Sequence, residues 1–241
     1  MSTLSSEPQC FPYIVCYFGY TRGQLKGRDT LAILSEYING PTLEEYINRL
    51  RKSDQMVPPE QLILYMYQLL VGMNHVHRLG YAHRDIKPGN IIFDTMHNAM
   101  KLIDFGLACI QRCKGVAGTL YWMPPELFKT PLPESLNAAQ AHDIWSLGLV
   151  FYELANHRLP FDVTGHETSS DIQRLVNSPF IPSHYSSGLL VDDKINHLID
   201  RTLQKSWRSR PTAVELMDYL ESVQKCKHRY FVPSETLNIA G

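Results

Sequence analysis

The chain has 241 residues, of which 44% are hydrophobic and 20% charged, and its formal net charge at pH 7 is −1. This composition is typical of a folded globular protein and excludes an intrinsically disordered one. The near-zero charge indicates neither a nucleic acid nor an anionic membrane as a partner. The sequence shows no apolar run long enough to span a bilayer and no secretory signal, so we expect a cytoplasmic protein. A nuclear protein is the open alternative.

The first forty residues predict two strands. β-Branched and aromatic residues fill 11–20 and 30–38, and two glycines make 21–29 a turn between them. The sequence Asn-Gly-Pro-Thr then breaks the second strand. A short helix is expected after it, from about Leu43 to Arg51.

A long helix is predicted from Pro59 to about Gly80. Pro59 and Glu60 suit a first turn, apolar residues then recur at helical spacing, and Gly80 is typical of the residue that follows a helix end. Two short apolar segments, 90–93 and 100–103, come next. They predict a small β-hairpin.

The rest of the chain is predicted to be mainly helical. Residues 143–155 are apolar nearly all round, which is typical of a helix buried on every side. Near the end, Thr212 and Glu215 have the spacing of a capping box at a helix start. A few strands followed mostly by helices predict an α+β fold.

The sequence HRDIKPGN, residues 83–90, presents three reactive side chains from one short loop. Asp85 could orient a hydroxyl and accept its proton, Lys87 could neutralise a transferring phosphoryl group, and Asn90 could bind a hard cation. Asp104, in the sequence IDFG, supplies a second oxygen ligand after a predicted strand. Each aspartate alone is typical of an ordinary turn, but the two in this order favour a phosphoryl-transfer site.

At these motifs the chain resembles the eukaryotic-type protein kinases. HRDIKPGN resembles their catalytic loop, DFG their metal-binding loop and GTLYWMPPE the end of their activation segment, and DIWSLG and RPTAVEL match two further signatures in the correct order. The likeness runs from about residue 11 to about residue 222. It implies a protein-kinase-like α+β fold, ATP and Mg²⁺ as cofactors, and a protein substrate.

The resemblance assigns a role to each residue of the loop. Asp85 would be the catalytic base, Asn90 and Asp104 would hold magnesium, and Lys87 would contact the γ-phosphate and the substrate. A lysine at this place is a mark of Ser/Thr kinases and favours Ser or Thr over Tyr as the acceptor. GTLYWMPPE is closest to the mating-pathway and MAP-kinase-kinase-kinase-like groups, although Leu120 replaces their Pro and Pro124 their Ala.

By the same resemblance, LAILSEYINGPTL leads into the adenine-binding hinge. Backbone groups from Glu36 through Ile38 would bind adenine, and Ile92 would form the floor of the pocket. Ser35 would stand at the gatekeeper position, where so small a residue predicts a deep back pocket. An ordinary buried strand serine is the alternative interpretation.

Scaffold residues also match the family. Asp143 would bond the backbone of the catalytic loop from the buried helix, and Glu126 would form a buried ion pair with Arg210. The alternative for Asp143 and Glu126 is a surface charge at a helix end.

Two parts of the kinase pattern are missing from the start of the chain. No glycine-rich loop fits before the first strand, no lysine occurs before Lys26, and Glu7 lies too near that strand to be the paired glutamate. We therefore expect residues 1–40 to be the remnant of a smaller lobe, two strands and a hinge, and residues 41–241 to be the large helical catalytic lobe. Three interpretations stay open: a piece of a longer kinase or a sequence that starts late, a short kinase helped by an activating or lobe-completing partner, and a pseudokinase-like binding module.

The segment 104–118 contains no Ser, Thr or Tyr. Kinases of this kind use the arginine beside the catalytic aspartate, here Arg84, to hold a phosphate on the activation segment. Thr119, the first hydroxyl residue, would lie beside Asp85 and Lys87, where a phosphate would repel Asp85. We therefore predict that phosphorylation does not switch this segment on.

The cysteines predict free thiols. Their number is odd and no CxxC pair occurs, which argues against a disulfide framework and indicates a reducing compartment. Zinc binding by the pair four residues apart is less favoured, because no matching His or Cys pair lies nearby. The five are Cys10, Cys16, Cys109, Cys113 and Cys226.

Overall fold

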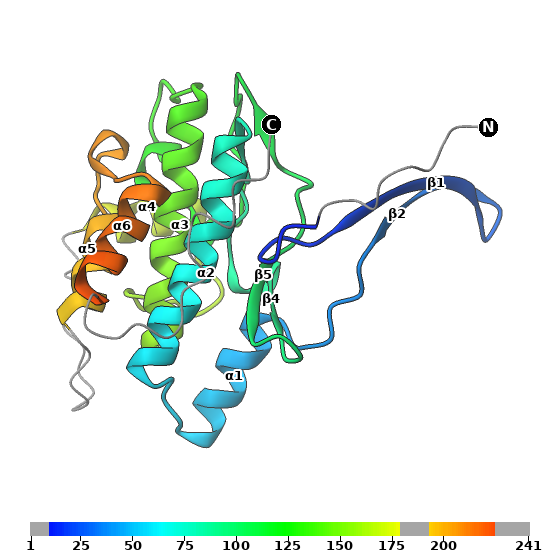
Figure 1. Ribbon diagram of the computed structural model, residues 1–241. Helices are drawn as coiled ribbons and strands as arrows, with labels where there is room; N and C mark the ends of the chain where they lie inside the picture. The colour runs from blue at the N-terminus through cyan, green and yellow to red at the C-terminus, as the bar shows by residue number, and fades with distance from the viewer. Residues whose placement is uncertain (1–9, 179–192, 225–241) are drawn as a thin grey trace.

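The computed structural model describes residues 10–178 and 193–224, and it has the predicted α+β order of strands followed by helices (Figure 1). The strands are β1 (Tyr17–Leu25), β2 (Arg28–Ser35), β3 (Tyr81–Ala82), β4 (Ile91–Asp94), β5 (Ala99–Leu102) and β6 (Cys109–Ile110). The helices are α1 (Leu43–Ser53), α2 (Pro59–Arg78), α3 (Leu136–Asn156), α4 (Ser169–Asn177), α5 (Asp193–Thr202) and α6 (Ala213–Gln224). The expectations for Glu7 and Cys226 lie outside the described residues.

Two long helices, α2 and α3, form the centre of the helical body. The helix α2 packs against α6 and β5, and α3 packs against α5. Both are buried on most sides, so the prediction of a fully buried helix over 143–155 is confirmed. The helix α3 begins earlier, at Leu136, because the Ser135 side chain accepts a hydrogen bond from the Ala138 backbone N–H. Among the described helices, none is both long and apolar enough to cross a bilayer.

Side-chain caps fix where the helices begin. Thr212 and Glu215 form the predicted reciprocal pair, in which the Thr212 N–H donates to the Glu215 carboxylate at 2.7 Å and the Glu215 N–H donates to the Thr212 hydroxyl at 3.4 Å. Thr42 and Glu45 cap α1 in the same way. After α2, Gly80 has a φ of +81°, which suits its predicted place beyond the helix end.

The predicted small hairpin is confirmed as β4 and β5. They pair antiparallel with Ile91 opposite Leu102 and Ile92 opposite Lys101. A second short pair joins β3 to β6. Together they hold the loops that follow β3 and β5 on one side of the helical body (Figure 1).

The first hairpin differs from its prediction. Residues 11–16 are not a regular strand, although Ile14 forms an isolated bridge with Leu102, and β1 instead runs through the segment expected to be a turn. Residues 21–25 pair with 28–32, which confines the turn to Lys26 and Gly27, both at positive φ. A two-residue loop with positive φ matches the twist of antiparallel strands, and this local geometry outweighs the two glycines that suggested a longer turn.

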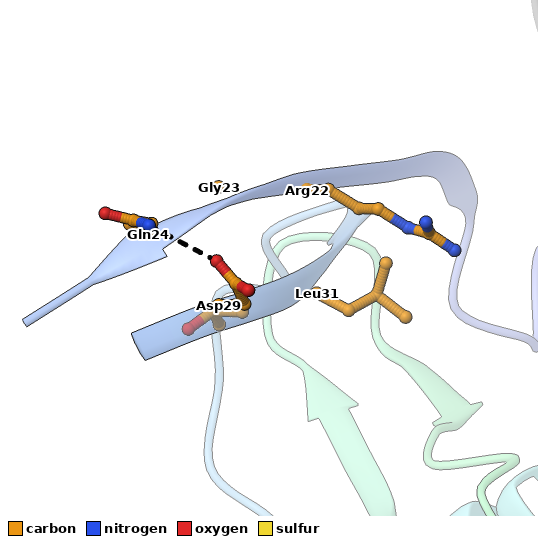
Figure 2. Close-up of a pocket in the computed structure, with 6 residues that line it drawn as sticks. Arg22, Gly23, Gln24, Asp29 and Leu31 are labelled. Atoms are coloured by element: carbon orange, nitrogen blue, oxygen red, sulfur yellow. Dashed lines mark hydrogen bonds between the residues drawn. The ribbon is translucent and has the colours of Figure 1, made fainter. Parts of the chain in front are cut away.

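The β1–β2 hairpin projects away from the helical body (Figure 1). At its outer end the Gln24 side chain donates to the Asp29 carboxylate at 3.3 Å, beside a shallow hollow that Arg22 and Leu31 also line (Figure 2). The described residues that line this hollow all belong to the hairpin. The expected division of the chain near residue 40 stays a prediction.

The expectation of free thiols is wrong for the four cysteines in the described ranges. Cys10 is bonded to Cys16, and Cys109 to Cys113. Each pair is close in sequence and lies where the chain bends, so its Cα atoms come within 5.0 and 5.5 Å, a separation that a disulfide spans. The odd number of cysteines in the sequence could not show that two pairs of them lie close together.

Candidate active site

The HRDIKPGN loop brings its predicted residues into direct contact. The Asp85 Oδ2 atom lies 3.0 Å from the Lys87 ammonium, and the Asn90 amide nitrogen donates to the same oxygen at 2.9 Å. The Thr119 hydroxyl completes the group: it donates to Asp85 Oδ1 at 2.7 Å and accepts from Lys87 Nζ at 2.7 Å. Thr119 thus lies beside Asp85 and Lys87, as predicted.

The surroundings of Asp85 favour its ionised form. Burial by itself would raise its pKa, but hydrogen bonds from Thr119 and Lys87, the charge of Lys87 and the Asn90 amide outweigh burial and hold the pKa below its usual value. The residue is only 9% exposed. At neutral pH it is therefore a shielded, charged acceptor within hydrogen-bond reach of a hydroxyl.

Asp143 on α3 holds the HRDIKPGN loop through hydrogen bonds to its backbone. It is fully buried, and its carboxylate accepts from the backbone N–H groups of His83 at 2.8 Å and Arg84 at 2.7 Å. Its third partner is the His77 ring, at 2.9 Å. Burial would raise the pKa of Asp143, but the hydrogen bond from His77 and the charges of the nearby histidines lower it. The expected bond between Asp143 and the loop backbone is confirmed, and His77 is a partner that the sequence did not reveal.

Backbone bonds place Asp104 next to the loop. The Ile103 N–H donates to the Asn90 carbonyl at 3.0 Å, and the His83 ring bonds the Ile103 carbonyl at 3.0 Å. Asp104 follows with a φ of +60° and stays exposed, while its Oδ1 accepts from the Gly106 N–H at 3.2 Å. Asn90 and Asp104 therefore offer an amide and a carboxylate oxygen from neighbouring segments.

These two oxygens suit magnesium, which prefers hard ligands and usually keeps several positions for water and phosphate. The Asn90 NH₂ group is engaged with Asp85, which leaves the amide oxygen as its ligand atom. In the part of the chain that the structure describes, no three His, Cys, Asp or Glu side chains gather as a larger metal site. A cation here would need ligands from a bound nucleotide.

The segment predicted to be the hinge is held by a contact that the sequence did not predict. Lys101 on β5 binds the Glu36 carboxylate at 2.7 and 2.8 Å, and the same carboxylate accepts from the Cys16 N–H at 2.8 Å. Lys101 lies opposite Ile92 in the β4–β5 pair. The structure therefore brings Glu36 next to the strand pair that carries Ile92. The one available signal was a lysine within the apolar run MKLI.

The other residues that were predicted to lie at the hinge have contrasting environments. Ile38 is buried, whereas Ser35 is exposed at the end of β2. The alternative of an ordinary buried serine is therefore wrong. The deep back pocket beside Ser35 stays a prediction.

Glu126 and Arg210 form the predicted buried ion pair. Two parallel hydrogen bonds of 2.6 Å join the guanidinium to the carboxylate. Arg210 also donates to the carbonyls of Gln204 and Ala141, and it lies over the Trp145 ring at 5.0 Å. Such complete pairing is what a buried charge requires, because an unpaired one is strongly destabilising.

Comparison with known proteins decides the family. Residues 3–220 match the family described as protein kinase domain. The chain belongs to the protein kinase family. The resemblance inferred from HRDIKPGN, DFG and the later signatures is therefore confirmed, together with the kinase-like α+β fold.

Curated relatives of this kinase chain come from several groups. It is 34% identical over 217 residues to serine/threonine-protein kinase Nek2 of Mus musculus, covering 86% of this chain and 46% of Nek2. It is 32% identical over 218 residues to mitogen-activated protein kinase kinase kinase 2 of Arabidopsis thaliana, covering 86% and 30%. Cell division control protein 7 of Schizosaccharomyces pombe is 30% identical over 233 residues, covering 90% and 20%. The chain thus spans less than half the length of these three relatives, and their similar identities are compatible with the MAP-kinase-kinase-kinase-like group without selecting it.

Proposed function

We propose that this chain is the catalytic part of a Ser/Thr protein kinase, which transfers the γ-phosphate of ATP to a hydroxyl of a protein. Asp85 acts as the base, and Lys87 neutralises charge on the transferring phosphoryl group. Asn90 and Asp104 hold Mg²⁺ through their side-chain oxygens. Relatives named as serine/threonine-protein kinases support this reading.

The Thr119 hydroxyl is the observation that carries the proposal. It donates a hydrogen bond to Asp85 and accepts one from Lys87, both at 2.7 Å. This is the pairing that an acceptor hydroxyl needs just before phosphoryl transfer: a carboxylate to orient it and a cation beside it. The hydroxyl of a protein substrate would contact the same carboxylate and ammonium groups. Thr119 would then lie at the edge of the position where the substrate docks.

The nucleotide would bind between the hinge and the β4–β5 pair. Backbone groups from Glu36 through Ile38 would meet adenine, and Ile92 would pack beneath it. The Glu36–Lys101 contact supports this placement, because it fixes the hinge against the strand that lies opposite Ile92.

The test is phosphotransfer from ATP with Mg²⁺ to a generic basic protein, by the parent chain and by Asp85→Asn. The substitution keeps the shape of the side chain but removes the base, so we expect activity to fall by about 100-fold or more. Asp162→Asn, at an exposed position, is the matched control and should keep the parent's rate. An Asp85→Asn chain that is as active as the parent would show that Asp85 is not the base.

A non-catalytic scaffold is the second candidate. The observation in its favour is the β1–β2 hairpin, where Tyr20, Leu31 and Ile33 are 63%, 58% and 71% exposed. Exposed apolar clusters of this kind mark protein-binding surfaces, including one for an activating or lobe-completing partner. Binding of ATP without any transfer, by a correctly folded chain, would favour the scaffold.

A further inference from the structure

The 104–118 segment has an unusual composition for a regulated loop. It contains no hydroxyl side chain that could carry a phosphate, but it contains two cysteines, Cys109 and Cys113, four residues apart. These are bonded to each other. Arg112 and Lys114 flank Cys113 and bring positive charge to the loop, which favours the reactive thiolate form when the bond is open.

The two sulfurs differ in their surroundings. Cys113 is only 5% exposed and lies in a small apolar cluster with Ala82 and Ala139, whereas Cys109 is partly exposed and packs against the edge of that cluster. Cys109 is therefore the sulfur that a dissolved reagent reaches first. Cys113 is the buried partner that can close the bond behind it.

The loop after Cys113 is held by the residue next to Asp85. The Arg84 side chain donates to the backbone carbonyls of Lys114 at 3.2 Å and Gly115 at 3.1 Å. Further on, a Cβ at Gly118 would lie 2.7 Å from the Arg84 carbonyl, so the two backbones touch. Thr119 then bonds Asp85. One short path therefore links the disulfide to the candidate base.

Few other contacts order the start of this path. Among the residues that the structure describes, the two-residue strand β6 pairs only with β3, and Arg112 adds one isolated bridge to Ser135. A covalent bond that closes Cys109 to Cys113 removes much of the freedom that so short a pairing leaves.

We propose that Cys109 and Cys113 form a reversible redox modification site, which takes a peroxide as oxidant and a protein dithiol as reductant, and that it sets the order of the 104–118 segment. The redox site itself is independent of the proposed function. Only its effect on phosphotransfer, through the order of the 104–118 segment, rests on that function.

Oxidation proceeds in two steps. The Cys109 thiolate attacks hydrogen peroxide, the O–O bond breaks, and a sulfenic acid forms with release of one water. The Cys113 sulfur then attacks the sulfenic sulfur, forms the S–S bond and releases a second water. Two electrons pass from the two sulfurs to the peroxide, and both thiol protons leave in the water formed.

Reduction follows the reverse logic. One thiolate of the dithiol attacks the exposed Cys109 sulfur, so that Cys113 leaves as a thiolate and takes up a proton. The second thiol of the reductant then resolves the mixed disulfide. Cys109 returns as a thiol, and the reductant carries away the two electrons as its own disulfide.

The test compares the chain after dithiothreitol with the chain after stoichiometric hydrogen peroxide. Differential alkylation with peptide mass spectrometry identifies the Cys109–Cys113 link, and hydrogen exchange measures peptides within 105–118. We expect the link to form only after peroxide and exchange in these peptides to slow by about tenfold. Cys109→Ser, and separately Cys113→Ala in case one variant folds poorly, should exchange like the reduced parent under both conditions.

Cys10→Ser/Cys16→Ser is the matched control, since it removes the other disulfide and should leave the tenfold difference intact. Failure of the link to form in the folded chain would overturn the proposal, and so would a link that changes exchange by less than about twofold. If neither redox state transfers phosphate, the proposed function fails while the exchange result still decides the redox site.

Discussion

The helical body and the β1–β2 hairpin contain similar apolar residues, but these are buried in the body and exposed in the hairpin. Ile144 on α3 is 1% exposed, whereas Ile33 on β2 is 71% exposed. A helix such as α3 meets neighbours on several sides, while each strand of the hairpin pairs with one other strand, and no further layer of the described residues covers the pair (Figure 1). An isolated two-stranded ribbon is only marginally stable. Apolar composition therefore makes a core only where the topology supplies a second surface.

The polar contacts of the two regions differ in the same way. Asp143 is fully buried and holds the HRDIKPGN loop through three partners, His77, His83 and Arg84. The hairpin is tied to the body at its base, where the Glu36 carboxylate meets Lys101 and the Cys16 N–H. The contacts of Asp143 are buried, whereas those of Glu36 lie at the edge of the helical body. We therefore expect substitutions in the body to lower the free energy of unfolding far more than substitutions in the hairpin.

The largest effect is expected from Asp143→Ala. It removes the acceptor of two buried backbone N–H groups and of His77, so the free energy of unfolding should fall by about 3–5 kcal/mol. Urea unfolding followed by circular dichroism measures it. The exposed Asp162→Ala should change the same quantity by less than about 0.5 kcal/mol. A loss below about 1 kcal/mol in Asp143→Ala would mean that water or another group replaces the carboxylate.

An intermediate effect, with a defined pH dependence, is expected at Glu153. Burial raises its pKa to about 7, against the opposing charge of Arg51, and its Oε2 atom finds no hydrogen-bond partner among the described residues. From about pH 4.5 to about 7 the unfolded carboxyl loses its proton while the folded one keeps it, so the free energy of unfolding falls as pH rises through this window.

Glu153→Gln removes this titration. The variant should match the parent below about pH 4.5 and be more stable by about 1–3 kcal/mol above pH 7. Urea unfolding at pH values from 4 to 8 checks the difference, with the exposed Glu134→Gln as the control that should show none. A constant difference at every pH would contradict the assignment of the titration to Glu153.

The smallest effect is expected in the hairpin. Ile33→Ala removes an exposed side chain, so it should change the free energy of unfolding by less than about 1 kcal/mol. Ile144→Ala is the matched change in the core and should cost about 2–5 kcal/mol. Both are measured by urea unfolding. Equal costs at the two positions would show that another surface covers the hairpin in solution.

Sequence patterns determined the local features of this protein. Helical spacing predicted α2 and the buried α3, the Thr212–Glu215 spacing predicted a cap, and the order of HRDIKPGN, DFG and the later signatures indicated the kinase family. The helices and the cap depend on the spacing of apolar residues and on hydrogen bonds between residues a few positions apart, and such information is present in any short window of sequence.

Only the tertiary structure decided which distant groups meet. Lys101 and Glu36 are 65 positions apart, and His77 and Asp143 are 66 apart. The sequence also did not predict that the hairpin is exposed, because an apolar strand has the same pattern whether or not another element covers it. It did not predict the Cys109–Cys113 bond either, because the number of cysteines does not show which sulfurs a bend brings together. Burial and long-range pairing arise from how elements pack on one another, and no single segment contains that information.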